Sequence, residues 1–161
     1  MKNIDKTISK NETMDAMILY QQSTPLVFTE TNIPEINDEQ VLVKVEACGL
    51  CRTDLHIIDG ELKNPKLPLI PGHQIVGKVV KTGKNVRNLN ISDRVGIPWL
   101  GHTDGSCKFC LKGLENLCDN PIFTGYTMDG GFAEYTAGYS DFCFKLPQNK
   151  DAKSLAPLLC A

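Results

Sequence analysis

The sequence of 161 residues contains no long hydrophobic run and no excess of charge of one sign. No stretch approaches the roughly 18 consecutive apolar residues that a membrane span needs, so we expect no membrane partner. Seventeen basic and 19 acidic residues leave a formal net charge of −2, which offers no basis for a nucleic-acid partner. The first residues, MKNIDKTISKNET, lack the apolar segment of a secretory signal. We therefore expect a cytoplasmic protein.

A dinucleotide-binding unit is also absent from these residues. No predicted strand is followed by a helix that opens with GxGxxG, the pattern that cradles a pyrophosphate. Cysteine, in contrast, is plentiful, with seven residues in the chain. In a reducing compartment such a number favours metal binding or catalysis over disulfides.

Short apolar runs separated by Gly and Pro predict a mainly β domain with few and short helices, close to a barrel. In QVLVKVEACG the alternation places Val41, Val43 and Val45 on one face of a strand and Leu42, Lys44 and Glu46 on the other. Gly77, inside another run, predicts a bulge or a close backbone approach. The predicted strands are 15–20, 26–30, 40–49, 73–83, 93–99, 130–138 and 141–147.

Two segments predict short helices. CRTDLHIIDG reads as a helical turn that ends at Gly60, and DAKSLAPLLCA begins a helix with Asp151 as its cap. The proline-rich residues 61–72, between the first of these segments and the strand that begins at residue 73, predict an irregular loop. The domain organisation that we expect is a disordered extension (1–13), one domain (14–150) with an irregular loop (about 101–120), and the start of a further helix (151–161).

The sharpest local motif is DGSCKFCLKGLENLC, in which Asp104 precedes three cysteines with the spacing C-x2-C-x7-C. Three thiolates and one carboxylate can complete a tetrahedral zinc site, and the metal would then order a loop that has no core of its own. The alternatives are free surface thiols with a turn aspartate, or water in place of the carboxylate. The predicted ligands are Asp104, Cys107, Cys110 and Cys118.

A second candidate set is dispersed along the chain: Cys51, His73 and Cys160. A catalytic zinc needs three protein ligands and an open position. Composition alone leaves the alternative of core cysteines and a surface histidine open. The CGLC stretch also matches a redox C-x-x-C pattern, but it lacks the βαβ setting of that motif, so Cys48 is expected to be buried and inert.

Six stretches now resemble one known family. They are EACGLCRTDLH, PLIPGHQIVGKVV, DRVGIPWLGHT, CKFCLKGLENLC, FTGYTMDGGFAEY and APLLCA. In this order they resemble the N-terminal, GroES-like catalytic domain of zinc-dependent medium-chain alcohol dehydrogenases, over residues 14–161. The resemblance implies oxidation of an alcohol to an aldehyde or ketone, or the reverse, with zinc and either NAD or NADP.

The resemblance also implies roles for single residues. Cys51, His73 and Cys160 would be the ligands of the catalytic zinc, and the aspartate–cysteine loop would hold a structural zinc. The other implied roles are a hydroxyl that takes the alcohol proton (Thr53), a carboxylate that orients the zinc-bound histidine (Asp54), a proton-relay histidine (His56), a basic residue near the cofactor pyrophosphate (Arg52) and two walls of the substrate pocket (Trp99, Leu100). Helix capping for Thr53 and a solvated surface position for His56 are the alternatives.

The sequence departs from the family pattern at three points. Gln74 stands where many members have glutamate, and Asp104 stands where the structural site has a fourth cysteine. The cofactor-binding Rossmann domain is not found in these residues. We therefore expect little or no dehydrogenase activity from this chain alone, about one zinc ion, held mainly by the loop site, and self-association through apolar surface.

Two other functions are compatible with the motifs. One is a non-catalytic zinc-binding or partner-binding remnant of a dehydrogenase. The other is a zinc-ribbon binder of nucleic acid, which the low net charge and the two lysines of the cysteine loop disfavour. Alcohol chain length, the choice of NAD or NADP and the oligomeric state do not follow from the sequence.

Overall fold

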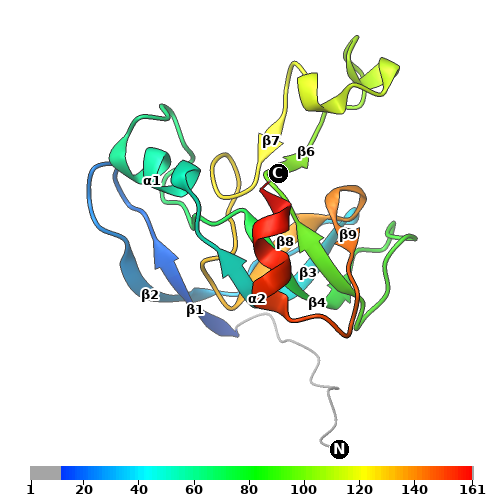
Figure 1. The fold of residues 1–161 in the computed structure, drawn as a ribbon, viewed down its shortest axis with the longest axis horizontal. Coiled ribbons are helices and arrows are strands. Elements are labelled where there is room, and N and C mark those ends of the chain that lie inside the picture. Colours follow the sequence, from blue (N-terminus) through cyan, green and yellow to red (C-terminus); the bar gives the residue numbers. More distant parts are fainter. Residues whose placement is uncertain (1–11, 161) are drawn as a thin grey trace, which may run out of the picture.

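The computed structural model describes residues 12–160, which form one five-stranded antiparallel sheet, two small sheets and a few short helices (Figure 1). Most of the expected extension at residues 1–13 lies outside the described residues. Its last residue, Thr13, already belongs to a strand, so the ordered β structure begins one residue earlier than expected.

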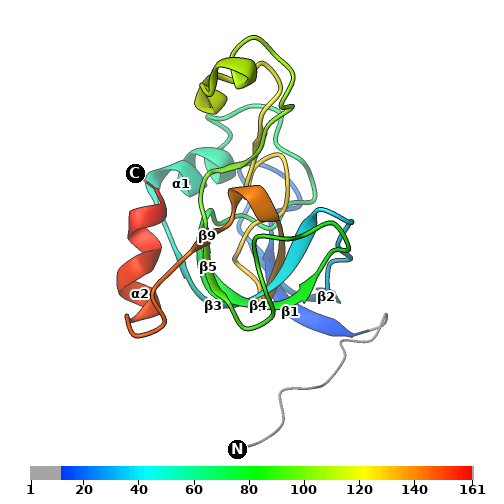
Figure 2. The same ribbon diagram turned by 90° about the vertical axis from the view of Figure 1, so that its right-hand side faces the viewer.

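The central sheet has the strand order β8-β3-β4-β5-β9. It curves strongly (Figure 2), but its edge strands do not pair with each other, so the sheet is open rather than a closed barrel. The expectation of a mainly β domain is confirmed. The strands are β3 (Gln40–Gly49), β4 (Gln74–Thr82), β5 (Arg94–Ile97), β8 (Tyr135–Tyr139) and β9 (Phe144–Lys145).

The main apolar core packs against one face of this sheet. Val41 and Val43 are fully buried there and Val45 packs against them, which confirms the predicted face of β3. Leu42, expected on the opposite face, is buried as well, so that face is also partly covered. At Gly77 of β4 an added Cβ would lie 2.3 Å from the Lys44 carbonyl oxygen, which confirms the predicted close backbone approach.

The two smaller sheets have two strands each. β1 (Thr13–Ile18) pairs antiparallel with β2 (Val27–Asn32). β6 (Leu100–His102) pairs with β7 (Ile122–Phe123), a pair that the sequence patterns did not reveal. The loop between β6 and β7 contains two 3-10 turns, Cys110–Lys112 and Glu115–Leu117, and projects away from the rest of the chain (Figures 1 and 2). We call residues 103–121 the cysteine lobe.

The described residues contain two α-helices. α1 (Arg52–Asp59) follows β3 and ends at Gly60, which adopts the left-handed conformation with φ of 87°. α2 (Ala152–Leu155) begins at Asp151, whose carboxylate accepts a hydrogen bond from the Ser154 N–H, as expected. α2 and the 3-10 turn Ala156–Leu159 that continues it pack on β3 and β4 through a second apolar cluster: Ala47, Val76, Leu146, Ala152, Leu155, Ala156 and Leu159. A further 3-10 turn, Ser140–Phe142, links β8 to β9.

None of the helices in residues 12–160 has the length and apolar character that crossing a membrane requires.

Candidate metal centres

The first candidate centre is built on the N-terminus of α1. Cys51 is the N-cap residue of this helix, and its sulfur accepts a hydrogen bond from the Thr53 N–H at 3.3 Å. Oδ2 of Asp54 in turn accepts the Cys51 N–H at 2.9 Å, which completes a capping box. The capping alternative for Thr53 therefore does not describe its side chain, because Cys51 is the cap.

Asp54 also fixes the orientation of His73. Its carboxylate is fully buried, and Oδ1 lies 3.2 Å from both Nδ1 of His73 and the Gly72 N–H. With Nδ1 directed at the carboxylate, Nε2 of His73 faces the Cys51 sulfur at 3.3 Å. Burial acts to lower the pKa of His73, but the hydrogen bond and the charge of Asp54 outweigh it, so this pKa is raised. A buried, carboxylate-bound histidine of this kind is the usual form of a metal ligand.

Cys160 completes the group. It follows the 3-10 turn after α2 and is exposed, and one ligand atom each of Cys51, His73 and Cys160 lies within 4.8 Å of the others. Ligands on one tetrahedral zinc ion are spaced by roughly 3.5–3.8 Å, from Zn–S and Zn–N distances of about 2.3 and 2.0 Å. Two sulfurs and one imidazole nitrogen at this spacing fit zinc with one position left open. We call these three residues the Cys–His–Cys group.

The second candidate centre lies in the cysteine lobe. One ligand atom each of Asp104, Cys107, Cys110 and Cys118 lies within 4.8 Å of the others, and the sulfurs of Cys107 and Cys110 are 3.5 Å apart. The N–H groups of Cys110 and Asp119 lower the pKa of Cys107, which favours the thiolate that a metal needs. Three sulfurs and a carboxylate fit a closed four-ligand zinc site.

Asp104 has a second role in the lobe. Its Oδ1 accepts the N–H groups of Ser106 and Cys107 at 2.9 Å, and its Oδ2 accepts the side-chain amide of Asn120 at 2.9 Å. Chiefly the Asn120 bond, together with the two N–H groups, lowers the pKa of this carboxyl. Asp104 is therefore both a turn residue and a candidate ligand. The two roles are compatible, because its two carboxylate oxygens carry enough lone pairs to accept these hydrogen bonds and also bind a metal.

The other predicted site residues are arranged around α1. Arg52 is exposed at the start of the helix, and Thr53 is half-buried beside Cys51. His56 is half-exposed, and its Nδ1 is paired with Oε2 of Glu61. Glu61 was not identified from the sequence. The chain reverses at Gly60, which brings Glu61 back to α1, and the predicted turn at Gly60 could have indicated this contact.

Trp99 lies against the Cys–His–Cys group. Its indole meets the His73 ring edge-on, with centroids 5.2 Å apart and planes at 77°. Leu100 begins β6 and pairs with Phe123, and it has no described contact with the three ligands. The rings of Phe123 and Tyr126 stack on the indole, and neither was identified from the sequence because they lie 24 and 27 residues further along the chain.

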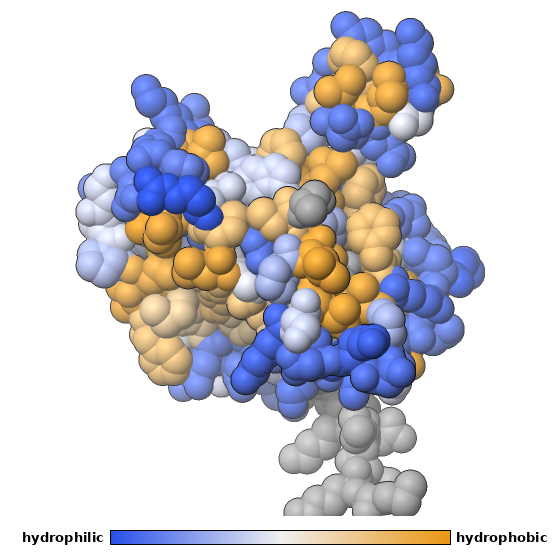
Figure 3. Space-filling view, in the orientation of Figure 1, coloured by the Kyte–Doolittle hydropathy of each residue, from blue (hydrophilic) through white to orange (hydrophobic). Residues whose placement is uncertain are grey.

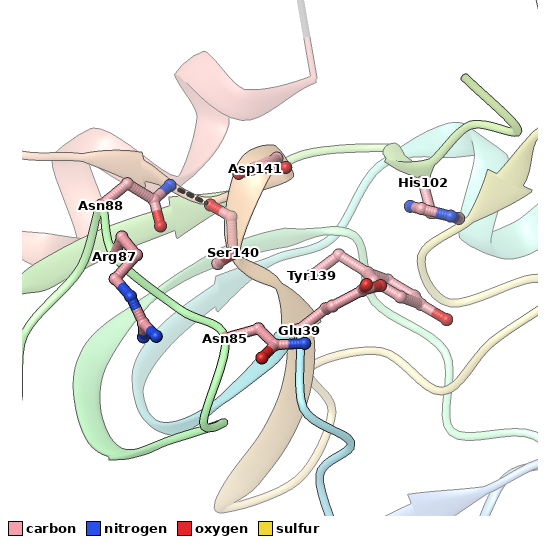
Figure 4. A pocket seen from close by; sticks show the side chains of 8 residues that line it. All are labelled: Glu39, Asn85, Arg87, Asn88, His102, Tyr139, Ser140 and Asp141. Carbon is pink, nitrogen blue, oxygen red and sulfur yellow. Dashed lines mark hydrogen bonds between the residues drawn. The ribbon is translucent and has the colours of Figure 1, made fainter. Parts of the chain in front are cut away.

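The structure also contains a polar hollow of about 350 Å³ (Figure 4). His102 and Tyr139, whose rings stack with centroids 4.0 Å apart, form one wall. None of the candidate metal ligands lines it. The remaining lining residues are Glu39, Asn85, Arg87, Asn88, Ser140 and Asp141.

An open, curved sheet with a Cys–His–Cys group at a helix N-cap and a separate cysteine lobe defines a zinc-binding dehydrogenase domain. The family description "Alcohol dehydrogenase GroES-like domain" matches residues 37–148, and the chain belongs to this family. The resemblance seen in the sequence is thereby confirmed.

Individual relatives agree with this assignment. An alcohol dehydrogenase of Geobacillus stearothermophilus is 46% identical over 149 residues, which cover 92% of this chain and 44% of the relative. A NAD-dependent alcohol dehydrogenase of Sulfolobus acidocaldarius is 40% identical over 157 residues, which cover 92% of this chain and 44% of the relative. The chain thus spans less than half the length of these relatives.

Solved structures show the same fold. A putative zinc-binding dehydrogenase from Sinorhizobium meliloti, bound to NADP, superposes with a TM-score of 0.83 at 34% identity, covering 91% of this chain and 42% of that one. A cobalt- and zinc-bound thermostable alcohol dehydrogenase from Pyrobaculum aerophilum superposes with a TM-score of 0.83 at 25% identity, covering 91% of this chain and 45% of that one. These neighbours support the GroES-like fold of the described residues.

Proposed function

We propose that this chain is the zinc-binding catalytic half of an alcohol dehydrogenase that interconverts alcohols and aldehydes or ketones with NAD or NADP. The observation that carries the proposal is the Cys–His–Cys group, in which the buried Asp54 directs Nε2 of His73 toward the Cys51 sulfur. The relatives that match most of the chain are named alcohol dehydrogenases, which supports the same reaction.

A zinc ion bound there would supply Lewis acidity, which brings the pKa of a coordinated alcohol toward neutral. The residues of the chain would do the rest of the local chemistry. Thr53, held beside Cys51 by the helix cap, would accept the alcohol proton at its hydroxyl as it releases its own proton toward His56. His56 would pass the proton to solvent, and its pairing with Glu61 at Nδ1 leaves Nε2 for that transfer. Arg52 at the exposed start of α1 would meet the cofactor pyrophosphate.

The lobe would hold a structural zinc ion through Asp104 and the three cysteines. These ligands stand close together in the sequence, so a metal can order the lobe without help from a hydrophobic core. In a reducing cytoplasm, where we place the protein, the seven cysteines would stay free of disulfides, as they are in the structure.

Catalysis by these residues alone would be weak or absent, because no GxGxxG unit is present to bind the nicotinamide cofactor. The apolar surface also favours self-association. Figure 3 shows apolar side chains over α2 and the turn that follows it, and at the tip of the lobe. Exposed members include Leu158 at 68% and Leu111 at 75%. Sedimentation of the chain as a monomer at high concentration would contradict self-association.

The test of the proposal uses cobalt as a spectroscopic substitute for zinc. Cobalt bound at the Cys–His–Cys group should give visible absorption bands that ethanol perturbs, because one position of the metal is open to a ligand. The variant His73→Ala should lose these bands, whereas Cys110→Ser should lose only those of the closed lobe site. Bands that are insensitive both to ethanol and to His73→Ala would contradict the proposal.

A titration with NADH separates the enzyme from the remnant. Quenching or enhancement of NADH fluorescence by the chain would support a catalytic half that already contributes to cofactor binding. No change at high cofactor concentration would favour the non-catalytic zinc-binding or partner-binding alternative. Neither result depends on turnover, so a weak enzyme and a remnant are distinguished.

A further inference from the structure

Three aromatic rings pack beside the Cys–His–Cys group. The centroids of Phe123 and Tyr126 lie 4.7 and 5.7 Å from that of Trp99, and each ring plane is inclined by 20° to the indole. The Phe123 and Tyr126 centroids are 6.4 Å from each other. Rings stacked on opposite faces of an indole would be separated by roughly 7 Å or more, twice the contact distance of about 3.5 Å between carbon atoms. Both rings therefore cover the same face of Trp99.

Tyr126 is held in place through its ring hydroxyl and through its main chain. Its hydroxyl donates a hydrogen bond to the Lys63 carbonyl at 2.5 Å, and its own carbonyl accepts the Lys66 N–H at 2.9 Å. Both partners belong to the proline-rich loop that follows α1. The ring thus joins this loop to the indole.

Trp99 is held at its main chain as well. Its carbonyl accepts the Thr124 N–H at 2.9 Å, which ties the Trp99 backbone to the residue that follows Phe123. The side chain also packs against the buried cluster of Leu19, Ile57 and Leu69. The remaining freedom is rotation of the indole about its side-chain torsions, and the two stacked rings oppose that rotation.

From these contacts we propose that Tyr126, aided by Phe123, is a positioning residue that locks the Trp99 indole edge-on to His73. Where the indole is locked, the space beside the Cys–His–Cys group has a fixed width, and that width limits the bulk of an alcohol that can reach the open ligand position. The second half of the proposal, the limit on alcohol bulk, rests on the proposed function. The first half, the positioning of the Trp99 indole, rests on the ring geometry alone.

The single tryptophan of the chain makes the first half directly measurable, because all tryptophan fluorescence comes from Trp99. Tyr126→Leu removes the ring and the hydroxyl, whereas Tyr126→Phe removes only the bond to Lys63. An aromatic stacking contact is strong enough to change the ratio of stacked to unstacked conformers by up to roughly tenfold. We expect Tyr126→Leu to lower the fluorescence anisotropy of Trp99 and to raise its quenching by acrylamide. Tyr126→Phe should restore most of the wild-type values.

Phe28→Leu is the matched control, because Phe28 is 67% exposed and has no described ring contact with Trp99. Thermal melts of every variant show whether it is folded at the temperature of the measurement. A folded Tyr126→Leu protein with wild-type anisotropy and quenching would overturn the positioning role. If Tyr126→Leu fails to fold, Phe123→Leu removes the other stacked ring, and wild-type anisotropy and quenching in that folded variant would overturn the positioning role.

The cobalt-loaded chain tests the second half. Its visible spectrum is titrated with ethanol, 1-butanol and cyclohexylmethanol. We expect the wild type to respond to the bulky alcohol more weakly than to ethanol, and Tyr126→Leu to reduce that difference. If no alcohol changes the wild-type spectrum, the proposed function fails while the fluorescence result still decides the positioning role. If ethanol changes the spectrum but the wild type and Tyr126→Leu show the same difference between ethanol and the bulky alcohol, the specificity inference fails and the proposed function stands.

Discussion

Oδ1 of Asp54 lies 3.2 Å from Nδ1 of His73, and the side chains are 0% and 2% exposed. A second oxygen of the same carboxylate accepts the Cys51 N–H, so one buried group positions two of the three candidate ligands. Removal of this group should disturb the metal site more than the fold of the sheet, because Asp54 contributes to none of the buried apolar clusters that pack against the strands.

The substitution Asp54→Asn tests this arrangement. An asparagine keeps the shape but loses the charge, and its amide cannot accept both the Cys51 N–H and the His73 N–H in the present geometry. We expect cobalt affinity at the Cys–His–Cys group to fall by about 10- to 100-fold, the usual cost of losing a carboxylate behind a histidine ligand. Competition with a chromophoric chelator measures the affinity. Asp59→Asn, an exposed change on the same helix, is the control, and equal affinities of the two variants would refute the prediction.

The metal content of the purified chain should differ between the two centres. Cys118 in the lobe is buried and its co-ligands lie within 15 positions, whereas Cys160 is exposed and stands far from Cys51 and His73 in the sequence. After dialysis we expect about one zinc ion per chain, retained by Cys160→Ser and lost by Cys110→Ser. Elemental analysis gives the number directly. Two tightly held ions that persist in Cys160→Ser would show that the exposed group binds as firmly as the lobe.

The features that the sequence predicted correctly are those that local chemistry determines. The Asp151 cap, the left-handed Gly60 and the buried face of β3 each depend on residues within a few positions of one another. The strands β6 and β7 were missed because two or three residues are too few to show a period of two. The alternation correctly separated Leu42 from the face of Val41 and Val43, but it could not show that Leu42 is buried as well, at 2% exposed.

The candidate site shows the same division. The lobe ligands could be identified by spacing, since all four lie within one short loop. The Cys–His–Cys group could be identified only by resemblance, because spacing does not select Cys51, His73 and Cys160 from seven cysteines and three histidines. Tyr126 and Glu61 were not identified, since their roles depend on how loops fold back onto Trp99 and His56.

Two of the seven cysteines should resist alkylation. Burial raises the pKa of Cys48 to about 12, and burial with the nearby Asp141 carboxylate raises that of Cys143 to about 12 as well. At pH 8 roughly one such thiol in ten thousand is a thiolate, which is the reactive form. In the presence of a chelator, iodoacetamide should therefore modify the other cysteines first, as mass spectrometry of digested protein would show. Cys48, expected to be buried, is partly buried in the structure, and its early modification would contradict the raised pKa and favour the redox interpretation of the CGLC stretch.

The pairing of Asp93 with Lys145 should make the stability of the β5–β9 edge depend on pH. Nζ of Lys145 lies 2.9 Å from Oδ2 of Asp93, and this ammonium first, with the Asn90 N–H second, holds the pKa of the carboxyl below its ordinary value of 3.8. A pKa that is lower in the folded state means stability that is present above pH 3.8 and is lost as the pH falls through the folded value.

We therefore expect Asp93→Asn to lower the free energy of unfolding at pH 7 by about 0.5 kcal/mol, the size of a partly exposed pair, and to have no effect below about pH 3. Urea unfolding of both proteins with a chelator present, from pH 2.5 to 7, measures the difference without a metal contribution. Lys145→Gln and the double variant complete the cycle, and their coupling should shrink in high salt because the pair is partly exposed. A deficit of Asp93→Asn that is constant across this pH range would mean that Asp93 acts through its hydrogen bond to Asn90 and not through its charge.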